Sequence, residues 1–372
     1  MQKITIAERL GTSVPTRVTI LGCGRWASFH AWYQAVKLGN EVMMWGREGD
    51  QIFDRLNKKR KNDFWKLPKN VSLTSSLETA FEHSDIIYII ISAQGMRDLS
   101  KLIASTLSEM GTSTKTFILC MKGIDEVSQM TLSQLLRHEL DIAHEKLHNI
   151  NVWVGPGHVQ EFLEGQPGAM IIAGEQPEIV EKIVKDNSTE SLRLYASDDL
   201  VGCEIGAAAK NVLGIAAGIL DGIGFSSLKG ALMARGAYEV SRLIAAMGGN
   251  QMTAYGLSHL GDFEATLFSR NSNNRKFGQV LVEHIKKKGA DSITNKTLTD
   301  EMGRLKPQQL ADIYGLSLAE GVATSIAMFQ LSIKHNVEMP ISETIYQILH
   351  EGRDPVRAMW SYFRRESRHE FH

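Results

Sequence analysis

GCEIGAAAKNVLGIAAGILDGIG, residues 202–224, is a long run of small and apolar residues that holds a single lysine. Strand and helix patterns alternate before it, and helical patterns follow it. At helical spacing, one stripe of the run carries Gly206, Lys210, Gly214, Ala217 and Asp221. Such a stripe lets a second backbone or a flat ligand approach closely, which would leave Lys210 partly desolvated and suited to exchange protons near neutral pH. The alternative is a buried core helix whose lysine extends to the edge of the core.

The same run is not predicted to span a membrane. Its uninterrupted apolar part, residues 211–220, has about half the length that a bilayer requires. Glu204, Lys210 and Asp221 interrupt the wider window, and charged side chains are unfavourable in a bilayer. We therefore expect no stable membrane insertion.

The composition is ordinary for a soluble globular protein, with 43% hydrophobic and 22% charged residues, and 372 residues are enough for two domains. A formal net charge of −1 gives no field that would hold nucleic acid, so we expect a small-molecule substrate and no nucleic-acid partner. The three cysteines are odd in number and scattered, as is usual for reduced intracellular thiols. Residues 1–15 form a polar extension without the apolar segment of a signal peptide. We expect a cytoplasmic protein.

A glycine-rich turn, GCGRWA at residues 22–27, lies between a β-rich run and a helical pattern, and a second β-rich run follows at the distance of a βαβ unit. This G-x-G-x-x-A pattern in that context is typical of dinucleotide binding. Gly22 would allow the tight turn, and Gly24 would let a pyrophosphate approach. The helix would start at Arg25 and Trp26, with its first amides facing the phosphates. The alternative is an ordinary glycine-rich turn.

The end of the second β-rich run lacks the usual acid that binds a ribose. Gly46-Arg47-Glu48 stands there instead. An arginine suits a 2′-phosphate, which favours NADP(H) or tolerance of both cofactors, whereas Glu48 keeps NAD(H) open. Alternatively, Arg47 is a solvated loop residue.

The strands are predicted from nearly unbroken apolar runs, which indicate burial on both faces, as in a parallel doubly wound sheet with helices between the strands. The predicted strands are residues 17–21, 41–45, 85–91, 116–121, 152–155, 169–173 and 192–196. Ligands gather at the carboxyl ends of such strands. Lys122 follows one of these ends, so it would point across the crevice that holds the nicotinamide. The alternative is a charged loop residue.

Residues 144–148, HEKLH, match the H-E-x-x-H pattern of zinc proteases. They lie on a short charged helical pattern, and no clearly placed third ligand follows. We expect a solvated helix face and no metal site.

The second half of the chain is predicted to be helical. Its segments are residues 231–247, a helix from Phe277, a pattern over residues 307–336 that residues 339–341 break, and short helices from Ser342 and Pro355. Asp262 follows a glycine in GLSHLGD, residues 256–262, and is suited to approach a lysine ammonium. The polar run of residues 269–276 is suited to a small phosphate, or it is an exposed loop. We expect a dinucleotide-binding domain over residues 1–197 and a helical substrate-binding domain over residues 198–372.

Together these motifs resemble the soluble NAD(P)-dependent glycerol-3-phosphate dehydrogenases, from about residue 17 to about residue 357. The resemblance rests on residues 22–27, Trp45-Gly46, Lys122-Gly123, Gly155-Pro156, residues 207–224, residues 260–262 with Thr266, Glu320-Gly321 and residues 337–346. It implies a Rossmann domain joined to an all-helical domain, an active site between them, and a homodimer. It also implies NAD(P)H-dependent, reversible reduction of dihydroxyacetone phosphate to sn-glycerol 3-phosphate, which supplies glycerophospholipid synthesis.

The resemblance also implies roles for individual residues. Lys210 would protonate the carbonyl oxygen as hydride leaves the nicotinamide, Lys122 would polarise that oxygen, and Asp262 would orient Lys210. The implied substrate contacts are Lys122, Gly155, Asn211, Thr266, Asn274 and Arg275. The implied cofactor contacts are Gly22, Gly24, Arg25, Trp26, Arg47, Lys122, Arg275 and Glu320.

The chain departs from the family pattern at the phosphate site. Where the family usually has Arg-Asn-Arg, this sequence has Asn273-Asn274-Arg275, so the main phosphate arginine is absent. Either Arg270 or Arg275 takes over this contact, or the substrate differs. Residues 92–94 and 157–158 also differ from the commoner forms. Three interpretations of the function follow: a glycerol-3-phosphate dehydrogenase, a related reductase of another small hydroxy or keto compound, and a dinucleotide-binding sensor without catalysis.

Overall fold

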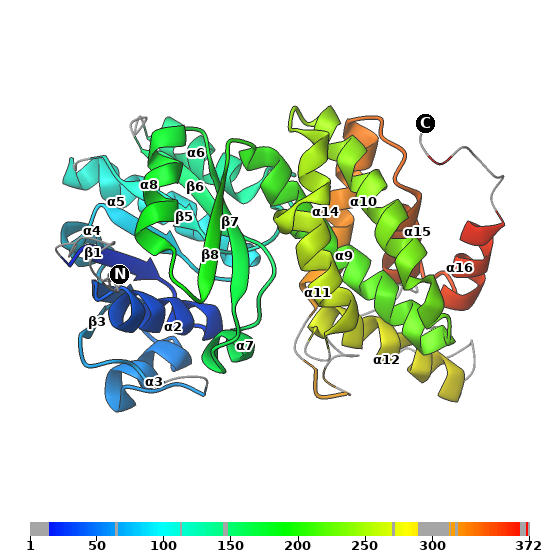
Figure 1. Ribbon diagram of the computed structural model, residues 1–372, viewed down its shortest axis with the longest axis horizontal. Coiled ribbons are helices and arrows are strands. Elements are labelled where there is room, and N and C mark those ends of the chain that lie inside the picture. Colours follow the sequence, from blue (N-terminus) through cyan, green and yellow to red (C-terminus); the bar gives the residue numbers. More distant parts are fainter. Residues whose placement is uncertain are drawn as a thin grey trace, which may run out of the picture.

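The computed structural model describes residues 15–63, 66–111, 114–143, 148–269, 272–288, 312, 314–316, 319–364 and 370. An α/β body and a helical body lie side by side along the long axis of the molecule (Figure 1). The chain passes from the first to the second where the last strand ends at Ser197 and the longest helix begins at Leu200. This order confirms the predicted combination of a Rossmann-type sheet with a helical C-terminal part.

The α/β body is built on one eight-stranded sheet with the order β3-β2-β1-β4-β5-β6-β7-β8. The strands are β1 (Arg17–Leu21), β2 (Glu41–Trp45), β3 (Val71–Thr74), β4 (Ile86–Ile89), β5 (Thr116–Leu119), β6 (Asn149–Val154), β7 (Gly168–Gly174) and β8 (Leu192–Ser197). The chain order reverses direction between β1 and β4, and such a switch point is where doubly wound sheets bind ligands.

Two predictions about the sheet need correction. β3 was not expected, because the edge strand VSLT has two polar residues and a single buried one. We also expected parallel strands throughout, whereas β6 and β7 pair antiparallel. An antiparallel pair needs no crossover over a face of the sheet, and the connection between these strands holds only the five-residue helix α7 (Val159–Leu163).

Helices cover both faces of the sheet, as the apolar strands predicted. They are α2 (Arg25–Trp32), which continues as the π-helix η1 (Tyr33–Lys37), α3 (Gln51–Lys59), α4 (Leu77–His83), η2 (Ala93–Gly95), α5 (Met96–Met110), α6 (Leu132–Ile142) and α8 (Pro177–Asn187). β4 shows the two-sided burial directly. Ile87 and Ile89 pack into the core on one face, and Tyr88 packs into the core on the other.

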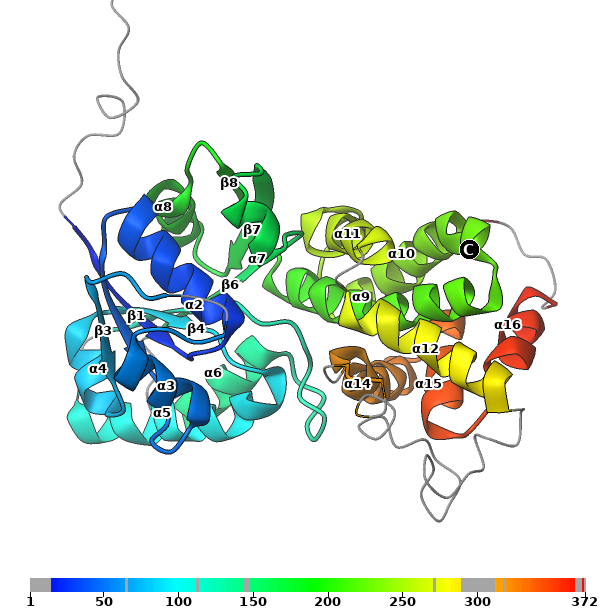
Figure 2. The same cartoon turned by 90° about the horizontal axis from the view of Figure 1, so that it is seen from below.

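The helical body surrounds α9 (Leu200–Ile223), which runs through its centre (Figure 2). Around it lie η3 (Ser226–Leu228), α10 (Lys229–Ala246), η4 (Gln251–Tyr255), the π-helix η5 (Leu257–Gly261), α11 (Asp262–Phe268), α12 (Asn273–Lys288), α14 (Glu320–Lys334), α15 (Pro340–His350) and α16 (Pro355–Phe363). The Asp199 carboxylate caps α9 by accepting from the Gly202 amide at 2.9 Å. Gly224, with a φ of +98°, ends the helix in the left-handed conformation.

The small residues of α9 receive another backbone. A Cβ on Gly218 would lie 1.9 Å from the carbonyl oxygen of Arg275, and a Cβ on Gly278 would lie 2.2 Å from that of Ile215. Glycines on both helices therefore let α9 and α12 pack with their backbones in contact. By length and composition α9 could cross a membrane, but 94% of its most apolar window is buried inside the protein, as expected of a core helix.

Helix starts differ from the predictions in several places. α10 begins at Lys229 rather than at residue 231. α12 begins at Asn273 rather than Phe277, because the Ser272 hydroxyl accepts from the Arg275 amide at 3.3 Å and so caps the helix earlier. α15 begins at Pro340, which was expected to break the pattern, because proline is well tolerated at the first position of a helix. Of the helical pattern predicted over residues 307–336, the structure places α14 at Glu320–Lys334, after a turn at residues 314–315 in which Gly315 has a φ of +61°. Residues 144–147 and 307–311 lie outside the described residues.

Candidate active site

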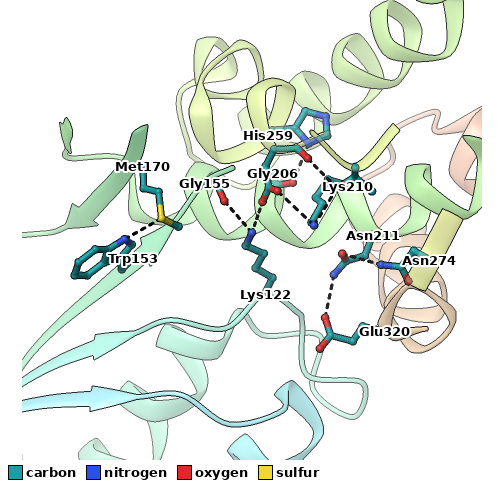
Figure 3. Close-up of polar contacts among 12 residues, drawn as sticks. Lys122, Trp153, Gly155, Met170, Gly206, Lys210, Asn211, His259, Asn274 and Glu320 are labelled. Carbon is teal, nitrogen blue, oxygen red and sulfur yellow. Dashed lines mark hydrogen bonds and ion pairs between the residues drawn. The ribbon is translucent and has the colours of Figure 1, made fainter. Parts of the chain in front are cut away.

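Lys122 reaches from the α/β body toward the helical body. It lies three residues beyond β5, and its Nζ donates to the carbonyl oxygen of Gly155, after β6, at 3.0 Å. The same Nζ forms an ion pair with Oδ2 of Asp262. The loop that carries Lys122 is also anchored three residues further along the chain, where Asp125 forms an ion pair with Arg97. Lys122 therefore has a fixed direction, across the boundary between the two bodies (Figure 3).

Asp262 also contacts a second ammonium group, that of Lys210 on α9. Oδ1 of Asp262 lies 3.4 Å from Nζ of Lys210, and that Nζ also donates to the hydroxyl of Thr266 at 3.1 Å. The Thr266 hydroxyl in turn donates to the backbone carbonyl of Asp262 at 2.8 Å. One carboxylate thus joins two lysines that come from different parts of the chain, as the sequence analysis anticipated for Asp262 and Lys210.

Burial and charge set the ionisation of this group. Burial lowers the pKa of Lys122 below its usual value, the neighbouring Lys210 lowers it further, and Asp262 opposes both effects. Burial alone would raise the pKa of Asp262, but the two ammonium groups outweigh burial and hold it below its usual value. Asp262 therefore stays charged, and it holds two cations at one point. Two fixed ammonium groups can stabilise negative charge that develops on an oxygen and can supply a proton to it.

An amide network adjoins the lysines. Nδ2 of Asn274 donates to Oδ1 of Asn211 at 3.0 Å, and Nδ2 of Asn211 donates to Glu320 at 3.5 Å. The Gly321 amide donates to Oδ1 of Asn274 at 2.9 Å. These contacts join α9, α12 and α14 next to Lys210 (Figure 3). Glu320 itself is exposed.

Arg275 points to a different place from the lysine pair. Its Nε donates to Oδ2 of Asp221 at 2.6 Å, and its guanidinium also donates to the carbonyl oxygen of Ser269 at 2.9 Å. Asp221 lies eleven residues after Lys210 on α9, which is roughly 16 Å along the helix axis. Asn273, in the first turn of α12, is exposed. Arg270, the other candidate for the phosphate contact, lies outside the described residues.

The glycine turn after β1 has the geometry of a phosphate-binding turn. Gly22 has a φ of +133°, and a Cβ there would lie 2.1 Å from the carbonyl oxygen of Ile90. Nothing lies within 4 Å of a Cβ built on Gly24, and no side chain caps the α2 amino end at Arg25. An open helix amino terminus next to a glycine accepts the pyrophosphate of a dinucleotide. The residues present therefore fit this cofactor.

Two further residues predicted for the cofactor flank this turn. The Trp26 ring, in the first turn of α2, is partly buried and packs 5.1 Å from the ring of Phe29. Arg47 follows β2 and is exposed. Its guanidinium lies near η2, because a Cβ on Gly95 would lie 3.4 Å from its Nη2.

One residue at the site was missed in the sequence. His259 in η5 is fully buried, and its Nδ1 lies 2.8 Å from the carbonyl oxygen of Gly206 on α9. The pattern in residues 256–262 pointed only to Asp262. The available signal was a pair of polar residues, Ser258 and His259, shortly before that aspartate in a segment of leucines and glycines.

Within the described ranges, no three His, Cys, Asp or Glu side chains come together in a way that could hold a metal ion. Of the H-E-x-x-H match, only His148 belongs to those ranges, and its Nδ1 accepts from the Lys115 amide at 2.9 Å.

Comparison with known proteins gives matches over both bodies. The family model described as NAD-dependent glycerol-3-phosphate dehydrogenase N-terminus matches residues 17–180, and the model of the C-terminus matches residues 199–360. A glycerol-3-phosphate dehydrogenase [NAD(P)+] of Salinibacter ruber is 33% identical over 345 residues, which cover 91% of this chain and 92% of the relative. The corresponding protein of a Thermoanaerobacter species is 30% identical over 360 residues, 96% of this chain and 99% of the relative.

Solved structures agree with these matches. The crystal structure of glycerol-3-phosphate dehydrogenase from Coxiella burnetii has a TM-score of 0.79 and 25% identity, and the match covers 94% of this chain and 99% of that one. A 2-dehydropantoate 2-reductase from Methylococcus capsulatus, with a TM-score of 0.52 and 12% identity, shares the fold alone. The chain therefore belongs to the family of NAD-dependent glycerol-3-phosphate dehydrogenases and is an oxidoreductase that uses NAD(H) or NADP(H).

Proposed function

We propose that this protein reduces dihydroxyacetone phosphate to sn-glycerol 3-phosphate, reversibly, and thereby feeds glycerophospholipid synthesis. The observation that carries the proposal is the pair of ammonium groups, Lys122 and Lys210, on the single carboxylate of Asp262. This arrangement suits a reaction in which a carbonyl oxygen becomes an alkoxide and then a hydroxyl. Family membership supports the substrate.

The chemistry follows from the positions of these groups. The bound dihydronicotinamide supplies the hydride that the carbonyl carbon accepts. Lys122 polarises the carbonyl oxygen, and Lys210 donates the proton that converts it to a hydroxyl and then recovers a proton from water. Asp262 keeps its negative charge throughout, so it orients both ammonium groups without taking up a proton itself.

Neighbouring groups are suited to hold the substrate. We assign the hydroxyl contacts to Thr266 and Asn211, which lie beside Lys210. Gly155 is assigned to the substrate through its carbonyl, which already holds the Lys122 ammonium. Asn274 and the first amides of α12 would meet the phosphate, because a helix amino terminus favours an anion. Arg275 can join them only by exchanging its contact with Asp221.

The cofactor is assigned to the switch point of the sheet. Gly22, Gly24, and the amides of Arg25 and Trp26 would hold the pyrophosphate. Arg47 would meet a 2′-phosphate where one is present. Lys122, Arg275 and Glu320 complete the cofactor contacts that the family resemblance implies. We take residues 1–197 as the dinucleotide-binding domain and residues 198–372 as the substrate-binding domain.

A related reductase of another small hydroxy or keto compound is the second candidate. Asn273 in place of the usual arginine and the engagement of Arg275 by Asp221 favour it. A substrate panel with NADH and NADPH separates the two, with dihydroxyacetone phosphate, unphosphorylated dihydroxyacetone and short 2-keto acids as substrates. We expect saturable turnover with dihydroxyacetone phosphate and sn-glycerol 3-phosphate as the product. Turnover only with an unphosphorylated compound would favour the second candidate, and cofactor binding without turnover on any compound would favour a sensor.

We further propose that the protein is a cytoplasmic homodimer. The family resemblance supports the dimer, and the three free, buried cysteines agree with a reducing compartment. Light scattering of the purified chain tests the dimer, and a monomer at all concentrations would contradict it.

A further inference from the structure

His259 ties the segment that carries Asp262 to the helix that carries Lys210. Its Nδ1 lies 2.8 Å from the Gly206 carbonyl oxygen, one helical turn before Lys210. Its ring packs 5.8 Å from the ring of Phe263, the residue after Asp262, at an interplanar angle of 25°. Figure 3 shows His259 beside Gly206. The side chain is fully buried, so this contact is shielded from water.

The backbone around this contact leaves little room. A Cβ on Gly206 would lie 2.7 Å from the Cβ of His259, so η5 and α9 are already in close contact. η5 is a π-helical turn, a geometry that is rare and often occurs at functional sites. It leads directly into Asp262, the first residue of α11. Any shift of η5 away from α9 therefore moves the carboxylate away from Lys210.

We propose that His259 is a positioning residue for the reduction, which holds Asp262 at its distance from Lys210 by tying η5 to α9. The inference rests on the proposed function for its kinetic test. A substitution that frees η5 should loosen the contact between Asp262 and Lys210 without disturbing the glycine turn in the other body.

The imidazole is suited to this single task. Burial lowers the pKa of His259 to about 4, so the ring is neutral at physiological pH and its Nδ1 carries the proton that the Gly206 carbonyl accepts. Its Nε2 is buried without a hydrogen-bond partner among the described residues. A partnerless buried nitrogen reduces stability, so a role in filling the core alone would be served better by an apolar side chain.

The test compares His259→Leu with His259→Asn. Leucine fills the space without a donor, whereas the asparagine amide can replace Nδ1–H. We expect His259→Leu to lower kcat about 10- to 100-fold, the effect of a displacement on the order of 1 Å, with unchanged KM for the cofactor. His259→Asn should recover kcat to within a few-fold. Unchanged kcat in His259→Leu would overturn the proposal.

A control and a second readout separate this inference from the proposed function. His284→Leu changes another buried histidine, which lies in the last two turns of α12 and whose Nδ1 is 3.0 Å from the Tyr314 hydroxyl. This variant should leave kcat unchanged. Amide hydrogen exchange over residues 257–268 needs no substrate. It should become faster in His259→Leu and not in His259→Asn, even if the wild type turns over none of the substrates tried. Equal exchange in all three proteins would refute the tether.

Discussion

Asp262→Asn removes the negative charge that joins the two lysines while leaving the shape of the side chain nearly unchanged. At the 3.4 Å that separates Asp262 from Lys210, one such ion pair is worth about 5 kcal/mol at an effective dielectric constant of about 20. Water that enters beside the unpaired lysines screens part of this loss. We therefore expect the free energy of unfolding to fall by about 3 kcal/mol, the usual effect of removing one partner of a buried pair.

The kinetic effect has two parts. With the ammonium groups no longer oriented, kcat should fall by about 100- to 1,000-fold. The pH profile should also move. Burial and Lys210 lower the pKa of Lys122, and Asp262 is the group that opposes them most, so the substitution lowers this pKa further. Because the reaction requires the ammonium form, activity should be lost at a lower pH than in the wild type as the pH is raised.

The assay follows the absorbance of the reduced nicotinamide with dihydroxyacetone phosphate across the neutral and alkaline range. Glu239→Gln is the matched control, because Glu239 is a buried carboxylate that accepts from the Ile341 and Ser342 amides at 2.8 and 2.9 Å, and these contacts join α10 to α15, which carry none of the residues assigned to the site. It should lose stability, by about 1 to 3 kcal/mol, and keep its kcat and pH profile. An Asp262→Asn enzyme with normal kcat, or with an alkaline limb at higher pH, would refute the reasoning.

Three further outcomes are expected. Arg47→Ser should raise KM for NADPH about tenfold and leave KM for NADH within about twofold, because only NADPH carries a 2′-phosphate. Steady-state kinetics with both cofactors measure this, and equal changes in the two KM values would contradict it. Gly218→Ala should lower stability by about 2 to 3 kcal/mol in chemical unfolding, because its Cβ would lie 1.9 Å from the Arg275 carbonyl oxygen, and an unchanged midpoint would show that α12 shifts freely. Asp221→Asn should cost about 3 kcal/mol at neutral pH. Burial opposes the charge of Asp221, but Lys229 and Arg275 outweigh burial and lower its pKa, so its contribution is present above about pH 4 and lost as the pH falls further; a difference from wild type that persists in strong acid would contradict it.

Local patterns were sufficient for most of the fold. Residues close together in the sequence determine the glycine turn, the apolar strands and the long run that forms α9. The positions of these elements therefore agree closely with the predictions. β3 and the antiparallel pairing of β6 with β7 depend on which strand lies beside which, and short polar strands give little signal of that. The start of α12 was missed because a single capping side chain, that of Ser272, decides it.

The candidate site was predictable to a similar degree. Lys122, Lys210, Asp262 and Thr266 meet in the structure. The approach of Asp262 to a lysine was predicted from its place after a glycine, and the direction of Lys122 from its place after a strand, whereas Thr266 was indicated by the family resemblance alone. The commitment of Arg275 to Asp221 could not be foreseen, because it depends on how the α9 and α12 glycines set the two helices against each other. The contact of His259 with Gly206 could not be foreseen either, because these two residues lie 53 positions apart in the sequence and meet only in the folded protein.

The central claim is that Lys210 supplies the proton in a nicotinamide-dependent reduction of dihydroxyacetone phosphate. Its most direct test measures oxidation of NADH and NADPH with this substrate by the wild type and by Lys210→Ala, with cofactor binding followed separately by fluorescence. We predict saturable turnover by the wild type, and a loss of about 1,000-fold or more in the variant with cofactor affinity retained. Turnover by Lys210→Ala close to that of the wild type, or a wild type that binds the cofactor and leaves the substrate unchanged, would contradict the account.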